Sequence, residues 1–271
     1  GTLYENGFGV ALDAARAQAL YRQAADLGRG GATLISTTRP GSIYPVGVSF
    51  PDVSAAGLAA LQEQIDALKE DRSIKAVILS GNGKAFCAGH DIRQMTAGRE
   101  AEDKGKSYFE GLFARCTSVM LGLQRLPQPV IAQVHGIATA AGCQLVASCD
   151  LAVASDDCRF GVNGVNIGLF CSTPMVALSR NIPRKHAFEL LTTGEFMSAT
   201  RAAELGLINR AVPAEQLESE TRALADTIAS KLGAAVKVGK EAYYQQLEMP
   251  IEEAYAYTSE VIVTNLMQPD T

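Results

Sequence analysis

Two loops of small residues have the composition to bind a ligand through their backbone. Each follows an apolar run that predicts a strand, at residues 76–80 and 130–134, and each leads into a helical stretch. The loops span residues 81–91 and 135–142. Small side chains let a ligand approach the main chain, and the first N–H groups of a helix have no intrahelical acceptor. Two such N–H groups can together hold an oxyanion. The alternative is that each loop is a tight turn whose small residues only serve packing.

The elements that must position these loops alternate between strand and helix. Apolar runs at 32–36 and 151–154 predict two more strands, which, like the first two, are expected to be buried on both faces. Residues 55–69 carry leucine and isoleucine at helical spacing. The later chain predicts helices, with little strand signal between them, at residues 187–193, 199–204, 215–231 and 252–266. This order predicts an α/β fold with a helical C-terminal region.

Composition and charge exclude several classes of protein. Of the 271 residues, 24 are Lys or Arg and 29 are Asp or Glu, and the net charge of −5 argues against a nucleic-acid binder. No apolar run reaches the roughly 18 residues of a membrane span, and the N-terminus lacks the residue order of a secretory signal, so we expect a cytoplasmic protein. The six cysteines share no C-x-x-C spacing and the three histidines lie far apart. We therefore expect reduced thiols and no metal.

The first 28 residues differ in character from the rest and predict a helix, a turn and a second helix. Their spacing of small and aromatic residues resembles one Sel1-like repeat. A single repeat cannot bury its apolar face alone, so the segment is either a remnant of an array or a docking site for a protein partner. An ordinary helical hairpin over residues 1–30 is the alternative.

Several ordered motifs resemble the enoyl-CoA hydratase/isomerase family, the crotonase superfamily, over about residues 31–267. They are KAFCAGHD (84–91), PVIAQVHG (129–136), AAGCQ (140–144), CDLAVA (149–154), TGE (193–195) and AxxxGLINRAV (202–212). The resemblance implies a ββα spiral core at 31–195, a C-terminal helical trimerisation region at 196–271, and a homotrimer or hexamer. It also implies that a coenzyme A thioester is the substrate or ligand and that no cofactor is bound covalently.

Carried over to this sequence, the family's two oxyanion donors are the backbone N–H groups of Ala88 and Ala141. The two glutamates of the hydratases correspond to Gln144 and Gly164. Glutamine orients water but is not a base near neutral pH, and glycine supplies no functional group. We therefore expect the two-glutamate hydratase chemistry to be absent. In this respect, and in the run CSTP (171–174), the chain resembles the enoyl-CoA hydratase domain-containing subgroup.

Other residues of the loops are candidates for binding or proton transfer. His90 suits acid–base chemistry, or it stabilises its turn. Asp91 contacts the ligand or caps the following helix. Cys171 is a nucleophile or a packing residue. The resemblance also places Cys87, Gly89, Gly142 and Asn166 at the substrate, and Lys84 and Arg93 either at the coenzyme A phosphates or in solvent.

Three functions remain open at this point. The first is an enzyme acting on an acyl-CoA thioester, nominally an enoyl-CoA hydratase or isomerase. The second is a non-catalytic acyl-CoA binder or scaffold, which Gln144 and Gly164 favour. The third is an interaction protein with no coenzyme A site.

Overall fold

The computed structural model describes residues 34–35 and 43–48, which form strands, and residues 53–268. The helical hairpin expected at residues 1–30, with its Sel1-like character and possible protein partner, lies outside the described residues.

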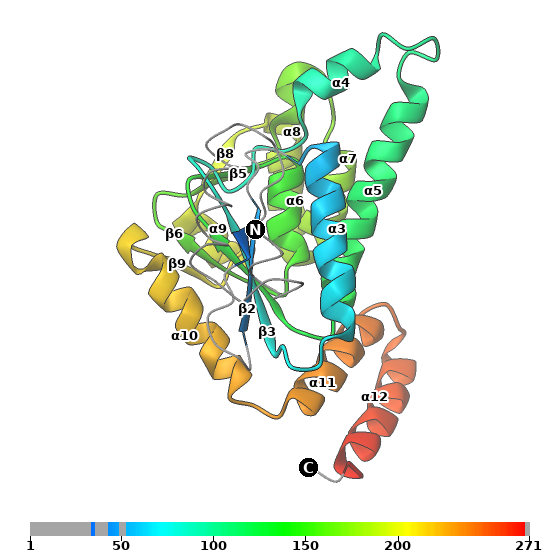
Figure 1. The fold of residues 1–271 in the computed structure, drawn as a ribbon, viewed down its shortest axis with the longest axis vertical. Helices are drawn as coiled ribbons and strands as arrows, with labels where there is room; N and C mark the ends of the chain where they lie inside the picture. The colour runs from blue at the N-terminus through cyan, green and yellow to red at the C-terminus, as the bar shows by residue number, and fades with distance from the viewer. Residues whose placement is uncertain (1–33, 36–42, 49–52, 269–271) are drawn as a thin grey trace, which may run out of the picture.

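A six-stranded sheet lies at the centre of the described part of the chain (Figure 1). In spatial order its strands are β1 (Leu34–Ile35), β2 (Ile43–Val48), β3 (Ala76–Gly81), β4 (Val130–Val134), β6 (Leu151–Ser155) and β9 (Arg210–Val212). β1 and β2 are antiparallel, and the other neighbouring strands are parallel. The carboxyl ends of β3 and β4 therefore lie side by side, and both small-residue loops begin there.

The predicted strands at 76–80, 130–134 and 151–154 are confirmed, and β1 covers only part of 32–36. The sequence did not predict β2 or β9. β2 contains Pro45 and Gly47, which are depleted in strands. β9 has three residues, too few to show a period.

Helices cover both faces of this sheet, as the continuous apolar runs predict. Val77 and Leu79 of β3 belong to a core cluster that includes α3 (Ala55–Glu70), α5 (Lys106–Arg125) and α6 (Ala141–Ser148). Ala76 and Ile78 pack instead with α10 (Leu217–Ala229). Successive strand side chains point to opposite faces, so α10 covers the face away from α3, α5 and α6 (Figure 1).

A second sheet of three short strands lies among the described residues. It contains β5 (Ile137–Thr139), β7 (Arg159–Gly161) and β8 (Phe196–Ser198). β8 joins this sheet and β9 joins the larger one, although both follow residue 195. The sheets therefore include residues on both sides of the boundary that the sequence suggested between core and C-terminal region.

The remaining helical elements connect and flank the sheets. They are α4 (Ile92–Gly98), η1 (Asn163–Ile167), α7 (Ser172–Asn181), α8 (Arg184–Thr193), α9 (Ala199–Leu205), η2 (Ala214–Gln216), α11 (Gly233–Gln246) and α12 (Ile251–Leu266). The sequence analysis missed α5, α7 and α11. The buried Leu112, Cys116, Val119 and Leu123 of α5 do follow helical spacing. In α11 one residue, Ala242, is buried among those described, so this helix has no apolar stripe.

A buried ion pair attaches α11 to the sheet. Lys240 Nζ lies 2.6 Å from Asp150 Oδ2 and also donates to the carbonyl oxygens of Leu123 and Gln128. The Tyr244 hydroxyl donates to Asp150 Oδ1 at 2.8 Å. Burial lowers the pKa of Lys240, and the charge of Asp150 acts in the opposite direction. The pair therefore holds α11, a helix within the C-terminal helical region, against the start of β6.

Candidate functional site

Strand-like pairing brings the two small-residue loops together. Phe86 N–H donates to the His135 carbonyl at 3.0 Å, and Cys87 N–H donates to Ile137 O at 3.1 Å. In return Thr139 N–H donates to Cys87 O at 3.0 Å. Cys87 and Ala138 thus form a parallel bridge between segments fifty residues apart in sequence. This bridge places Ala88 close to the start of α6.

Two glycines permit this close approach. A Cβ atom on Gly142 would overlap the carbonyl oxygen of Cys87. Gly89 adopts a φ of +98°, and a Cβ there would lie 3.0 Å from Ala140 Cβ and 3.6 Å from Ala141 N. The two glycines therefore serve packing, as the alternative interpretation of the loops expected. The same packing brings the two loop backbones into contact.

The backbone N–H groups of Ala88 and Ala141 both lack an acceptor among the described residues. Ala141 is the first residue of α6, where an N–H group has no intrahelical partner. Ala140, just before it, adopts a φ of 50°, a left-handed conformation that L residues rarely take, while its own N–H donates to Gly161 O at 2.9 Å. Ala88 is exposed and Ala141 is buried.

Gln144 lies one helical turn after Ala141, with 6% of its surface exposed. Helical side chains lean toward the N-terminus of their helix, so its amide lies over the first turn of α6. Its Oε1 atom is buried and has no hydrogen-bond partner among the described residues. The helix that begins at the Ala141 donor therefore also holds a buried amide.

Gly164 cannot hold a side chain in this structure. It lies in η1, and a Cβ atom there would overlap the Leu169 carbonyl oxygen and lie 2.9 Å from Cys171 Sγ. Leu169 N–H donates to Gly164 O at 2.9 Å, which fixes the turn. A glutamate would not fit here without movement of the backbone.

The side chains of His90 and Asp91 are both held by hydrogen bonds to the backbone of the protein. The His90 Nδ1–H donates to Val53 O at 3.0 Å, and the ring lies edge-on to Phe113 at 5.5 Å between ring centres. Burial lowers the pKa of His90, and its Nε2 has no partner among the described residues. The Asp91 carboxylate accepts from Arg93 N at 2.8 Å and from Gln94 N at 3.4 Å, which supports the helix-cap interpretation.

Three further candidates lie at the surface. Lys84 is exposed, and the side chain of Arg93 is 94% exposed and lies 3.8 Å from Asp91. Asn166 donates to Gly194 O at 3.2 Å and so supports the turn after α8. Among the described residues, the Asn166 side chain therefore makes its hydrogen bond away from the amides of Ala88 and Ala141.

Sequence reasoning gave Asn163 no role of its own. The Thr139 hydroxyl donates to Asn163 Oδ1 at 2.8 Å and lies 3.1 Å from Gly161 O. Thr139 precedes Ala141 by two residues, so Asn163 is held beside the second loop. In the sequence, its position directly before Gly164 was the one feature that could have indicated Asn163 as a site residue.

The six cysteines are buried and form no disulfide. Burial raises the pKa of Cys116 to about 11 and those of Cys143 and Cys158 to about 12. It also raises the pKa of Cys171, which disfavours the thiolate that a nucleophile requires. The packing interpretation of Cys171 is therefore the better supported one.

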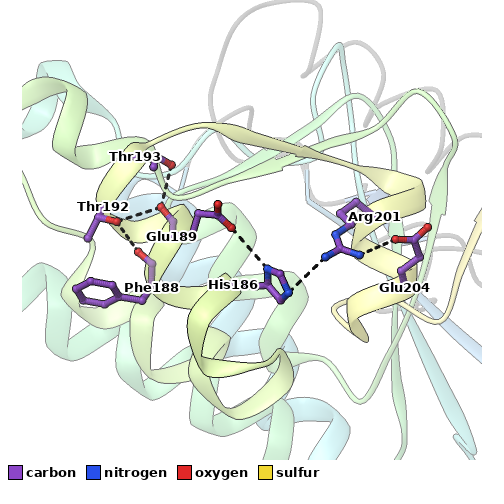
Figure 2. A network of polar contacts seen from close by, with 7 residues as sticks. All are labelled: His186, Phe188, Glu189, Thr192, Thr193, Arg201 and Glu204. Atoms are coloured by element: carbon purple, nitrogen blue, oxygen red, sulfur yellow. Dashed lines mark hydrogen bonds and ion pairs between the residues drawn. The ribbon is translucent and has the colours of Figure 1, made fainter.

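The third histidine lies in a surface network between α8 and α9 (Figure 2). Arg201 Nη2 donates to His186 Nε2 at 3.3 Å, and Glu189 Oε2 lies 3.5 Å from Nδ1. Arg201 also pairs with Glu204 at 2.8 Å. Because the arginine occupies Nε2, the neutral ring carries its proton on Nδ1, toward Glu189.

Neither a metal centre nor a membrane span is found in the described part of the chain. No group of three or more His, Cys, Asp or Glu side chains there is arranged to hold a metal ion. No described helix combines the length and the apolar character that crossing a membrane requires.

Residues 52–270 match the family described as Enoyl-CoA hydratase/isomerase. The chain therefore belongs to the enoyl-CoA hydratase/isomerase family, and the predicted crotonase fold, an α/β fold with a parallel sheet, is confirmed.

Individual relatives place the chain more closely within the family. It is 52% identical to the enoyl-CoA hydratase of Mycobacterium smegmatis, whose crystal structure superposes with a TM-score of 0.83 over 88% of this chain and 91% of that one. The human enoyl Coenzyme A hydratase domain-containing protein 3 is 42% identical, with a TM-score of 0.81 over 87% and 93% of the two chains. The Xenopus laevis protein "Enoyl-CoA hydratase domain-containing protein 3, mitochondrial" is 46% identical over 79% of this chain and 71% of its own length.

These relatives correct one expectation. The frog protein and its mouse and human counterparts are all named mitochondrial. The cytoplasmic location expected from the sequence is therefore wrong, because amino-acid composition carries little information about a protein's compartment.

Proposed function

We propose that the protein binds an acyl-CoA thioester and holds the thioester oxygen between the N–H groups of Ala88 and Ala141. The observation that carries this proposal is the pair of backbone donors that find no acceptor among the described residues, brought together by the Cys87–Ala138 bridge. Preorganised donors stabilise the charge that develops on the oxygen of an enolate or a tetrahedral intermediate. Loss of one such donor typically lowers a rate by about 100- to 1,000-fold.

The same geometry argues against ordinary hydratase chemistry. Each general acid or base contributes roughly 100- to 10,000-fold to a rate. Gln144 offers an amide where the hydratases have a carboxylate, and the space beside Gly164 is filled by Leu169 and Cys171. The proposal is therefore an oxyanion site in which the usual proton-transfer groups are missing.

Calorimetric titration with acetyl-CoA and crotonyl-CoA tests this function, with the enoyl absorbance of the crotonyl-CoA sample followed over time. We expect both thioesters to bind and crotonyl-CoA to be hydrated far more slowly than by a two-glutamate hydratase. Absence of binding at millimolar thioester would refute the proposal and favour the interaction protein. Rapid hydration would contradict the assignment of Gln144 and Gly164 as inactive, and would point to His90.

A non-catalytic acyl-CoA binder is the second candidate, and the closed space at Gly164 favours it. Exchange of the α-protons of bound acetyl-CoA in D₂O, followed by NMR, separates the two candidates. An oxyanion site that stabilises an enolate accelerates this exchange, whereas a binder leaves the rate at that of free acetyl-CoA.

A further inference from the structure

The first small-residue loop is held by the segment that leads into α3. The Val53 N–H donates to the Gly89 carbonyl oxygen, and His90 Nδ1–H donates to the Val53 carbonyl oxygen at 3.0 Å. One buried residue thus both donates to the loop and accepts from it. We call this pair of hydrogen bonds the Val53 clamp. Gly89 adopts a φ of +98° and has no side chain to restrict it, so contacts from outside the loop must fix its conformation.

The clamp connects the loop to a well-anchored helix start. Val53 is 3% exposed and belongs to the core cluster that includes the buried face of α3. Ser54 caps this helix, because its hydroxyl accepts from Gly57 N–H at 3.1 Å. The Ala55 N–H donates to Gln94 Oε1 of α4 at 3.4 Å. The start of α3 therefore holds both the first loop and the helix that follows it.

The clamp and the second loop hold the Ala88 backbone from its two neighbours in sequence. On one side, the Cys87 carbonyl oxygen accepts from Thr139 N–H at 3.0 Å. This bond fixes the plane of the peptide group to which the Ala88 N–H belongs. On the other side, the clamp fixes the carbonyl group of Gly89. A backbone donor that is fixed before the ligand arrives stabilises charge without reorganisation.

The imidazole of His90 acts from inside the protein. A carbonyl oxygen only accepts, so Nδ1 carries the proton that is donated to Val53 O. The ring packs edge-on against Phe113 of α5, and Nε2 is buried as well. Burial lowers the pKa of His90, which favours the neutral ring near pH 7. Both ring nitrogens are therefore turned toward the protein.

We propose that His90 is a positioning residue, which holds the first loop in the conformation that presents its backbone N–H to the thioester oxygen. This inference rests on the proposed function, because the donor that is positioned is the one proposed at Ala88. In this role the imidazole acts through the backbone and exchanges no proton with the ligand.

Infrared difference spectroscopy of acetyl-CoA labelled with ¹³C at the thioester carbonyl measures how strongly the site polarises that bond. We expect the wild type to lower the carbonyl stretching frequency relative to free acetyl-CoA. His90→Leu occupies the space of the ring without a donor. It should lose most of this shift and bind acetyl-CoA about tenfold more weakly in calorimetry, the effect of one net hydrogen bond. His90→Asn keeps a donor for Val53 O and should retain both the shift and the affinity.

His186→Leu, which removes a surface histidine of α8, is the control and should match the wild type. An unchanged carbonyl frequency in His90→Leu, or its loss in His90→Asn as well, would overturn the inference and leave the proposed function intact. If the wild type binds no acetyl-CoA, or binds it without a shift, the proposed function itself fails. The two failures are therefore distinguishable.

A second measurement does not depend on the folding of His90→Leu. The chain has three histidines, so ¹⁵N NMR of the histidine-labelled wild type gives few signals, and His90→Asn identifies those of His90. We expect the proton on Nδ1 and an unprotonated Nε2, both with and without acetyl-CoA. A proton that appears on Nε2 or leaves Nδ1 when the thioester binds would contradict the positioning role.

Discussion

At the scale of single residues, the proposed oxyanion site depends on glycines that supply no functional group but leave space for the two loops to meet. Gly142 matters because its missing side chain lets Cys87 reach α6, and Ala88 follows Cys87 directly. We expect Gly142→Ala to push the two loops apart and weaken the binding of acetyl-CoA, measured by calorimetry. A reaction that uses both amides should slow by about 100-fold or more.

Gly239 offers a matched control in α11, where an added Cβ meets nothing within 4 Å. We expect Gly239→Ala to leave binding unchanged and to raise the free energy of unfolding by up to about 1 kcal/mol. Equal binding by the wild type and Gly142→Ala would show that loop contact does not create the site.

His90 makes a separate prediction about pH. Burial lowers its pKa in the folded protein below the value of 6.5 for an exposed histidine. The unfolded chain therefore takes up this proton first as the pH falls. The contribution of His90 is complete above about pH 6.5 and is lost on acidification, with a slope of at most about 1.4 kcal/mol per pH unit.

Urea unfolding of the wild type and of His90→Asn between pH 5 and 8 measures this contribution. Asparagine keeps a donor for Val53 O but does not titrate. The variant should therefore lose less stability than the wild type below pH 6.5. Identical pH slopes for the two proteins would contradict the assignment.

At the scale of elements, α11 is attached to the sheet through one buried charge pair. The side chains of Lys240 and Asp150 are 6% and 13% exposed. We expect Lys240→Met to lower the free energy of unfolding by about 3–5 kcal/mol, because Asp150 then keeps a buried charge without its counter-ion. Chemical denaturation measures the loss.

The surface pair of Lys69 and Asp66, with side chains 42% and 55% exposed, is the comparison. We expect Lys69→Met to change stability by about 0–1 kcal/mol, since solvent already screens that pair. Similar losses in the two variants would show that the buried pair does not anchor α11.

At the scale of the whole molecule, α12 extends from the body beside α11 and exposes an apolar face (Figure 1). In the described part of α12 one residue, Ala254, is buried. Ile251, Tyr255, Ile262 and Leu266 follow helical spacing along one stripe, and each is at least 59% exposed. An exposed apolar stripe of this length is typical of an interface. We expect a second copy of the chain to cover it, in the trimer or hexamer that the family resemblance implies.

Sedimentation equilibrium of the wild type and of Ile262→Glu tests this expectation. The charge should shift the assembly toward monomer, whereas Thr264→Glu, on another side of the same helix, should not. A wild type that sediments as a monomer at micromolar concentration would refute the interface.

The sequence by itself determined the features that depend on neighbouring residues. The period of α3, the apolar runs of β3, β4 and β6, and the caps at Asp91 and Ser198 are all local patterns, and the structure contains each of them. The ordered motifs also sufficed to recognise the family. The sequence did not predict the short strands β5, β7, β8 and β9, because three residues are too few to show a hydrophobic period.

Only the tertiary structure decided how the candidate site is assembled. The pairing of Cys87 with Ala138, the closed space at Gly164 and the Gln144 amide oxygen, which has no partner among the described residues, all depend on residues distant in the chain or on packing density. Local sequence contains the residue types but not the distances between them. A glycine that leaves space for a ligand and a glycine whose adjacent space is occupied by neighbouring atoms cannot be told apart from the sequence alone.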